Sequence, residues 1–178
     1  MAIPWYRTIT REQWRVLLAA KLGWMLDAMD FLLYVMVIGR LKEYFHFDDA
    51  MAGLLGTITL LISAAGGLFF GAIADRFGRA RTLIFTILIF SLGSFGAATS
   101  QTLTQLLLWR ALLGLGMGGE WASGAALVSE SWPAEHRTKA IGIMQSGWAL
   151  GYILAAIAAA VVLDVLPLGV EAWRWLFV

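Results

Sequence analysis

The chain has 178 residues and a formal net charge of +1, and 60% of its residues are hydrophobic while only 14% are charged. Soluble domains carry about 25% charged residues, so this composition excludes an ordinary water-soluble core. The small net charge gives no reason to expect a nucleic-acid partner. The sequence contains no cysteine, and so has no disulfide or thiolate metal site.

Residues 1–21 are predicted to form a cytoplasmic segment with an interfacial helix. Thr10-Arg-Glu-Gln13 fits a capping box, and tryptophans on either side of it suit the level of the lipid headgroups. A signal peptide would also place basic residues before an apolar run. However, the run that follows contains Asp27 and Asp30 and has no small-residue cleavage site. The first apolar run is therefore expected to stay in the membrane.

Long apolar runs predict an all-α polytopic membrane protein. Each run approaches or exceeds the ~17–25 residues that a helix needs to cross a ~30 Å hydrocarbon core. The predicted spans are residues 22–39, 52–74, 82–98, 103–129 and 140–165. The alternation typical of a membrane β-barrel is missing from these runs, which leaves helices. Residues 172–178 are interpreted as an aromatic anchor and the incomplete start of a sixth span, so the chain is expected to be truncated.

The basic residues predict a cytoplasmic N-terminus. One set of loops, together with the N-terminal segment, carries Arg7, Arg11, Arg15, Lys21, Arg76, Arg79, Arg81, Arg137 and Lys139. The alternate loops hold only Arg40, Lys42 and Arg174. Because basic residues accumulate on the cytoplasmic side of membrane proteins, the first set of loops is assigned to the cytoplasm.

Nucleotide, metal and catalytic motifs are absent from the sequence. Gly114 to Gly119 satisfies G-x-G-x-x-G, but it lies inside a membrane-length apolar run and not at a strand-to-helix turn. There is no phosphate-binding loop with G-x-x-x-x-G-K-[ST] and no H-E-x-x-H. The acids and bases within the spans form no recognisable catalytic set. We therefore expect neither an enzyme, nor a cofactor, nor a resident metal, nor transport driven by ATP.

Two aspartates in the first predicted span are candidates for proton coupling. Each charged group in hydrocarbon costs at least ~2.5–3.5 kcal/mol on insertion scales and usually faces a bundle interior or an aqueous cavity. Asp27 and Asp30 are three residues apart and so share one helix face. Their mutual repulsion favours a bound proton, as a proton-coupled carrier requires. The alternative is that one aspartate pairs with a neighbouring helix and only specifies packing.

The fourth and fifth predicted spans add further candidates. Arg110 and Glu120 lie ~15 Å apart along one helix and cannot pair with each other. Arg110 either binds an anionic substrate or a nearby carboxylate, or extends outward to the aqueous boundary. Glu120 either exchanges protons or makes a structural hydrogen bond in its neutral form. Gln145 begins a polar and aromatic stripe with Trp148 and Tyr152, which more often joins helices than touches substrate.

Three segments resemble signatures of the major facilitator superfamily. Gly71-Ala-Ile-Ala-Asp75-Arg-Phe-Gly78-Arg79-Ala-Arg81 is similar to the superfamily's loop signature G-x-L-a-D-R-x-G-R-k, with Ile73 in place of Leu and Ala80 in place of Lys. Leu106-x-x-x-Arg110-x-x-Leu113-Gly114-x-Gly116 is similar to its fourth-helix signature. Glu130, Pro133 and Arg137 match E-x-x-P-x-x-x-R.

The resemblance implies the first six-helix bundle of a twelve-helix carrier. The missing C-terminal half would then be the partner of this chain, with substrate between the halves near the midplane. The loop signature would latch the halves on the cytoplasmic side, where Asp75 would receive a helix N-terminus and Arg79 or Arg81 would pair with Glu130. The residues assigned to this conformational latch are Gly71, Asp75, Arg76, Gly78, Arg79, Arg81, Glu130 and Arg137.

Within the superfamily, Asp27-Ala-Met-Asp30 and Gly116-Met-Gly-Gly-Glu120-Trp121 resemble the symporter branches for sialates, monocarboxylates and aromatic acids. This implies proton-coupled uptake of a small organic anion across the bacterial inner membrane by alternating access, driven by the proton gradient. Asp27, Asp30, Arg110, Glu120 and Gln145 are the candidate site residues. Alternatives are a neutral sugar or metabolite porter, an exporter, and a half-length scaffold or sensor.

Overall fold

Five long α-helices make up most of the described chain. The computed structural model describes residues 4–165 and 169–178. The helices are α1 (Arg11–Phe45), α2 (Asp49–Phe77), α3 (Arg79–Thr99), α4 (Leu103–Ser131) and α5 (Arg137–Ala159). Short 3-10 helices, η1 (Trp5–Arg7) and η3 (Val170–Leu176), lie near the two ends, and η2 (Ala160–Val165) continues α5 as a π-helix. These ranges contain no strand, and the predicted all-α fold is confirmed.

The first helix is longer than its apolar run. The Thr10 hydroxyl accepts a hydrogen bond from the Gln13 backbone N–H, and the Gln13 side chain accepts one from the Thr10 N–H. This capping box begins α1 itself, so residues 11–21 are the first turns of a 35-residue helix and not a separate interfacial helix. No proline interrupts the helix after this cap, and α1 extends about 50 Å at 1.5 Å per residue.

A single glycine joins α2 to α3. Gly78 has φ +95° and ψ 141°, and it separates Phe77, the last residue of α2, from Arg79, the first of α3. Residues with a Cβ rarely adopt a positive φ of this size, so glycine is required for so tight a reversal. The Thr82 hydroxyl donates to the Gly78 carbonyl across 3.1 Å and satisfies one group of the turn.

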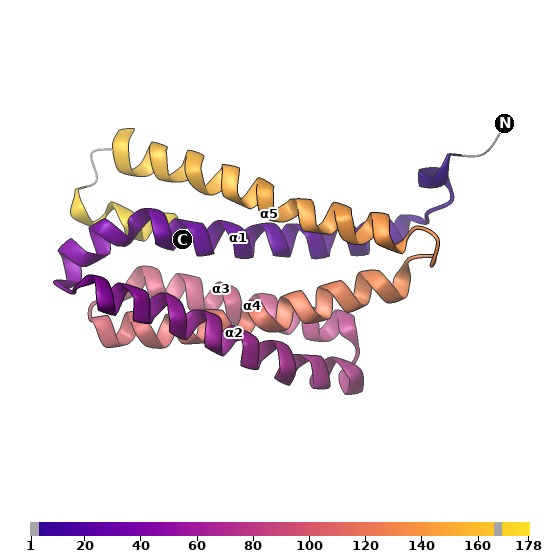
Figure 1. Ribbon diagram of the computed structural model, residues 1–178, viewed down its shortest axis with the longest axis horizontal. Coiled ribbons are helices and arrows are strands. Elements are labelled where there is room, and N and C mark those ends of the chain that lie inside the picture. Colours follow the sequence, from indigo (N-terminus) through magenta and orange to yellow (C-terminus); the bar gives the residue numbers. More distant parts are fainter. Residues whose placement is uncertain (1–3, 166–168) are drawn as a thin grey trace.

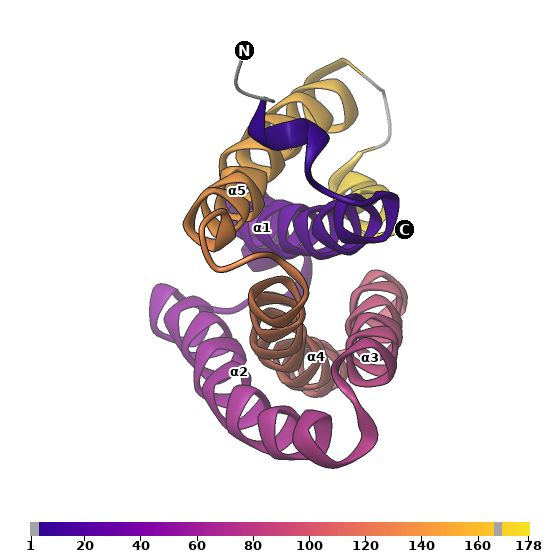
Figure 2. The same ribbon diagram turned by 90° about the vertical axis from the view of Figure 1, so that its right-hand side faces the viewer.

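Helix α4 lies at the centre of the arrangement. Figure 2 shows α1 and α5 together on one side of α4, with α2 and α3 on the other side. Glycines let α4 approach its neighbours: a Cβ at Gly114 or Gly118 would overlap the backbone of α2, and one at Gly116 would overlap the backbone of α3. Small residues at helix contacts allow this close packing in membranes.

The position of α4 explains its composition. Four helical stretches of the described residues are long and apolar enough to cross a membrane, namely α1, α2, α3 and Arg137–Leu163. The 29-residue α4 is not among them, although the sequence predicted a span at 103–129. Its neighbours bury the positions of Arg110 and Glu120, so α4 can carry these two charged residues. Outward-facing side chains such as Leu88 on α3, which is 60% exposed, suit contact with lipid tails.

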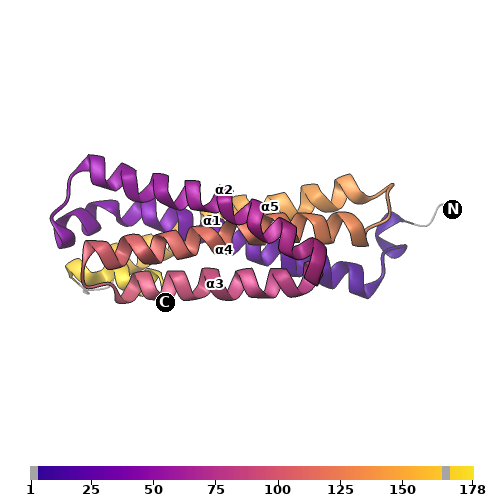
Figure 3. The same ribbon diagram turned by 90° about the horizontal axis from the view of Figure 1, so that it is seen from below.

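The long helices alternate in direction between two ends. Figures 1 and 3 show the N-terminal segment at the same end as the α4–α5 connection, and the α1–α2 and α3–α4 connections at the opposite end. The basic residues assigned to the cytoplasm therefore gather at one end of the bundle.

The C-terminal segment packs against α1. Trp173 is fully buried, with its ring centroid 6.0 Å from that of Tyr44 and 5.9 Å from that of Phe45. Arg174 donates to the carbonyl of Ala98 in α3 across 2.6 Å. The sequence predicted an aromatic anchor and the opening of a span at 172–178. The structure places a 3-10 helix there, held between α1 and α3.

Candidate functional site

A buried ion pair links α1 to α4. The Arg110 Nη1 donates to Asp30 Oδ2 across 3.0 Å, and the hydroxyl of Ser94 in α3 donates to Asp30 Oδ1 across 2.6 Å. The Arg110 side chain is 1% exposed and that of Asp30 is 7% exposed. Buried charges are tolerated when they are paired and hydrogen-bonded, and both oxygens of Asp30 have a donor.

Tyr34 covers a second side of Arg110. The guanidinium carbon lies 4.4 Å from the centroid of the Tyr34 ring, a cation–π geometry. The Tyr34 hydroxyl donates to the Ala52 carbonyl of α2 across 2.7 Å, which fixes the ring. Of the alternatives for Arg110, the structure shows the one in which it holds a carboxylate, since the side chain does not extend outward.

Asp27 and Glu120 are buried without such partners. Asp27 is fully buried and neither of its carboxyl oxygens has a hydrogen-bond partner among the described residues. Glu120 is 3% exposed, and its Oε1 also lacks a partner there. The Glu120 carboxylate lies against Gly23 of α1, where any Cβ would overlap it. Gly23 and Asp27 are four residues apart and share one face of α1. Glu120, which contacts α1 at Gly23, therefore lies about one helical turn from Asp27 along that helix.

Gln145 lies outside this buried cluster. It is exposed on the surface of α5, as is Tyr152, about two helical turns further along the same face. Trp148, between them, is half-buried and packs on Trp24 of α1 with ring centroids 4.7 Å apart. The sequence grouped Gln145 with the buried acids, but the structure does not bring them together.

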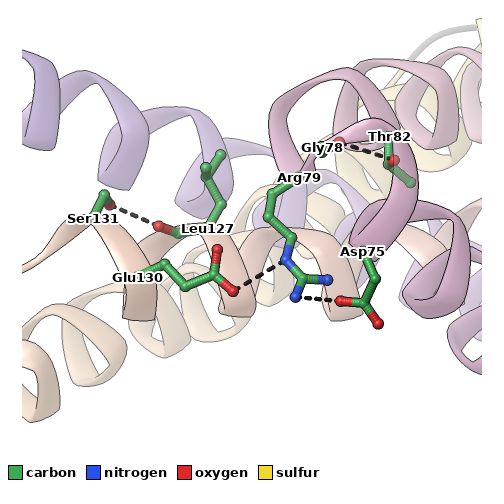
Figure 4. A network of polar contacts seen from close by, with 7 residues as sticks. All are labelled: Asp75, Gly78, Arg79, Thr82, Leu127, Glu130 and Ser131. Carbon is green, nitrogen blue, oxygen red and sulfur yellow. Dashed lines mark hydrogen bonds and ion pairs between the residues drawn. The ribbon is translucent and has the colours of Figure 1, made fainter.

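The candidate latch lies at the end of α2, α3 and α4 that contains Gly78. Arg79 Nη2 pairs with Asp75 Oδ1 across 2.5 Å, and Arg79 Nε pairs with Glu130 Oε1 across 3.1 Å (Figure 4). Figure 4 shows the Arg79 guanidinium between the two carboxylates, which come from α2 and α4. Of the two arginines proposed to pair with Glu130, the structure uses Arg79.

The other latch residues are placed around this ion-pair network. Arg76 lies over the Phe77 ring at 5.8 Å from its centroid, and Arg137 is the exposed first residue of α5. Arg81 is exposed and lines an apolar cavity with Phe70 and Phe77. In the described ranges no ion pair joins Arg76, Arg81 or Arg137 to an acid. Gly71 has open space beside its Cα.

Metal binding has no support within residues 4–165 and 169–178, where no three His, Cys, Asp or Glu side chains gather as a metal would require.

Sequence reasoning missed Ser94 and Tyr34. Neither carries a motif, and only the packing of α1 and α3 around α4 brings them to the ion pair.

A comparison with known protein families matches residues 22–178 to the Major Facilitator Superfamily. The chain belongs to this superfamily. The resemblance inferred from its loop and helix signatures is confirmed, and with it a multi-pass integral membrane protein of the bacterial inner membrane.

Two relatives of this superfamily member are transporters by name. A probable 4-methylmuconolactone transporter from Cupriavidus pinatubonensis is 42% identical over 173 residues, which are 97% of this chain and 40% of the relative. The sialic acid transporter NanX from Escherichia coli is 33% identical over 175 residues, 98% of this chain and 42% of that protein. The chain thus spans less than half the length of these relatives.

A solved structure shows the same fold. The xylose transporter XylE from Escherichia coli, in a partially occluded inward-open conformation, has a TM-score of 0.84 and covers 94% of this chain, while the chain covers 45% of XylE. The sequence identity is 19%, so the likeness concerns the fold alone. These matches support the prediction of an N-terminal half of the twelve-helix fold.

Proposed function

We propose that this chain contributes half of a secondary active transporter that takes up a small organic acid together with protons. Two relatives, a probable 4-methylmuconolactone transporter and a sialic acid transporter, support the substrate class. The second half of the site would come from the remaining part of a longer protein, with both halves embedded in the lipid bilayer. No cofactor is needed, because the proton gradient supplies the energy.

The buried acids Asp27 and Glu120 carry the proposal of proton coupling. An ionised carboxylate without donors is costly away from water, so each is a group whose charge can change during a transport cycle. Asp30 differs because Arg110 and Ser94 hold it. We infer that the coupled proton binds to Asp27 and Glu120, while the Asp30–Arg110 pair keeps α1 and α4 in register.

Coupling then follows from electrostatics. An organic anion near Asp27 and Glu120 is repelled when these acids are charged and accepted when they are neutral. Proton binding therefore favours substrate binding, and each ligand shifts the population of inward- and outward-open states only through such differential binding. The two halves would rock about the fixed site to expose it alternately to each side.

Uptake measurements test this function. In proteoliposomes containing the full gene product, an inward proton gradient is expected to accumulate benzoate or a sialic acid, and collapse of the gradient with a protonophore is expected to abolish accumulation. Accumulation of neutral sugars but not acids would favour the sugar-porter alternative. Loss of substrate from preloaded vesicles under an opposite gradient would favour an exporter, and no solute movement would contradict a transporter.

We propose that Asp75, Arg79 and Glu130 act as a conformational latch. The carboxylates of Asp75 and Glu130 are largely exposed, so water screens their attraction to Arg79 and stability depends little on it. A contact of this kind suits repeated breaking and re-forming as the cytoplasmic side opens and closes.

Glu130→Gln is therefore expected to change the rate of uptake several-fold while the melting temperature of the purified full gene product stays within a few degrees of the wild type. Glu135→Gln, an exposed acid in the following loop, is a matched control. Unchanged transport kinetics in Glu130→Gln would contradict the latch. A large loss of melting temperature would show that the contact is structural.

A further inference from the structure

Three tryptophans from three different helices meet beside the buried acids. The ring centroids of Trp24 in α1 and Trp148 in α5 are 4.7 Å apart, and those of Trp24 and Trp121 in α4 are 6.2 Å apart. Phe31, on the same helix as Trp24, extends the cluster, with its centroid 6.3 Å from that of Trp148. Spacings of this size allow aromatic rings to interact through their faces and edges.

An open cavity adjoins this cluster. Its volume is about 450 Å³, and it is lined by Trp24 and Trp121 together with Met117 of α4 and Ser63 and Gly67 of α2. This volume falls within the ~300–1,000 Å³ typical of small-molecule sites. Trp121 is 46% exposed, so its ring is accessible from the cavity. The lining is mainly apolar, with few polar groups, as is usual for such sites.

The cluster contains a polar group that suits a ligand. The indole N–H of Trp24 is buried and has no acceptor among the described residues. Buried tryptophan N–H groups usually find an acceptor, because an unpaired donor away from water is costly. A ligand with an oxygen acceptor next to a flat apolar body would satisfy both the donor and the surrounding rings.

The aromatic cluster is also adjacent in sequence to the proposed proton-binding acids. Trp121 follows Glu120, and Trp24 follows Gly23, against which the Glu120 carboxylate lies. Arg110 is already paired with Asp30 through Nη1 and covered by Tyr34, while its Nε and Nη2 are buried without a partner among the described residues. At the aromatic cluster itself, charge recognition would rely on neutral donors and on the protonation of the nearby acids.

We propose that Trp24 and Trp121, with Trp148 packed against Trp24, form an aromatic surface that binds the planar, unsaturated part of a carboxylic acid and selects such acids over saturated ones of the same charge. This rests on the proposed function and adds the specificity determinant. Flat π-systems gain favourable stacking on indole faces, whereas a puckered saturated ring makes poorer contact.

Paired ligands test the selectivity. Binding of benzoate and of cyclohexanecarboxylate, which differ in ring planarity but share one carboxylate, is measured by calorimetry on the purified full gene product. The wild type is expected to bind benzoate about three- to tenfold more tightly than cyclohexanecarboxylate. This ratio corresponds to the free energy that stacking contributes in aromatic pairs. Trp24→Leu and Trp121→Leu, at the two tryptophans that line the cavity, are expected to bring the ratio of the two dissociation constants close to one.

The conservative variants and a control separate recognition from packing. Trp24→Phe and Trp121→Phe keep an aromatic face and are expected to retain most of the selectivity. Trp175→Leu, which alters an exposed tryptophan of η3, is expected to leave it unchanged. A benzoate preference that survives in both leucine variants, or that is equally lost in both phenylalanine variants, overturns the aromatic surface.

Proton-driven uptake of the same two acids distinguishes the two proposals. Selective binding of benzoate without gradient-driven accumulation supports the aromatic surface and overturns the coupled transport. Accumulation of both acids with equal affinity supports the transport function and overturns the aromatic surface.

Discussion

Asp27→Asn is expected to lower proton-driven accumulation of the organic acid by at least about tenfold, as follows from removing a coupling free energy of typical size. Asparagine has nearly the shape of a protonated aspartate but cannot exchange a proton. Substrate binding is then less strongly linked to pH, because only Glu120 still exchanges a proton, while the helix packing around this fully buried position stays intact. Uptake into proteoliposomes with and without a pH gradient measures the effect.

Substrate exchange provides the discriminating control for Asp27→Asn. Counterflow between equal pH on both sides needs alternating access but no net proton movement, so the variant is expected to retain it. Glu120→Gln is also expected to lose proton-driven accumulation and to retain counterflow, because it removes the other carboxyl group that exchanges the coupled proton. Glu43→Gln, an exposed acid on α1, serves as the matched control. Gradient-driven accumulation at the wild-type level in Asp27→Asn would contradict the assignment.

Arg110→Leu is expected to reduce the free energy of unfolding by about 3–5 kcal/mol, the usual cost of breaking a buried ion pair by removing one partner. Asp30 would keep its hydrogen bond from Ser94 but lose the only positive charge that faces it in the described structure. Reversible unfolding of the purified full gene product, and the amount of folded protein in membranes, measure the loss. Wild-type stability of Arg110→Leu would show that the ion pair does not hold the helices.

A double mutant separates charge from packing at this pair. Asp30→Asn combined with Arg110→Leu leaves no unpaired charge and is expected to recover much of the stability that Arg110→Leu alone loses. Arg110→Lys keeps the charge but not the planar face over Tyr34, and is expected to fall between the wild type and Arg110→Leu. A double mutant no more stable than Arg110→Leu would contradict electrostatic pairing.

These two predictions assign different tasks to aspartates only three residues apart. Asp30 accepts hydrogen bonds from a cation and a hydroxyl, so both of its carboxyl oxygens have a partner. Asp27 has neither partner among the described residues. The difference arises from the neighbouring helices, because Arg110 on α4 and Ser94 on α3 lie within hydrogen-bonding distance of Asp30.

The fold class and the helix boundaries at Thr10 and Gly78 followed from the sequence alone. Apolar runs of membrane length predict helices because a chain in lipid must satisfy its own backbone hydrogen bonds within each segment. The Thr10 capping box and the required glycine at position 78 are local signals, and the structure places a helix boundary at each. The same local reading placed a separate helix before the first span, because it could not show that α1 runs on without a break.

The superfamily was also readable from the sequence, because its signature residues are close together along the chain. The candidate acids could be selected for the same reason: each is a charged residue inside an apolar run. Their roles in proton coupling and in the latch stay predictions, to be decided by the experiments above.

Only the tertiary structure decided which of these residues meet. Asp30 and Arg110 are 80 residues apart in sequence. Glu120 on α4 contacts Gly23 on α1, which is 97 residues earlier in the chain. Such contacts depend on how each helix is rotated and packed around α4, which no local pattern specifies. The same packing leaves Gln145 exposed, outside the buried cluster, and places Trp24, Trp121 and Trp148 next to one another. Hydropathy and capping act over a few residues, whereas a site between helices is set by the whole bundle.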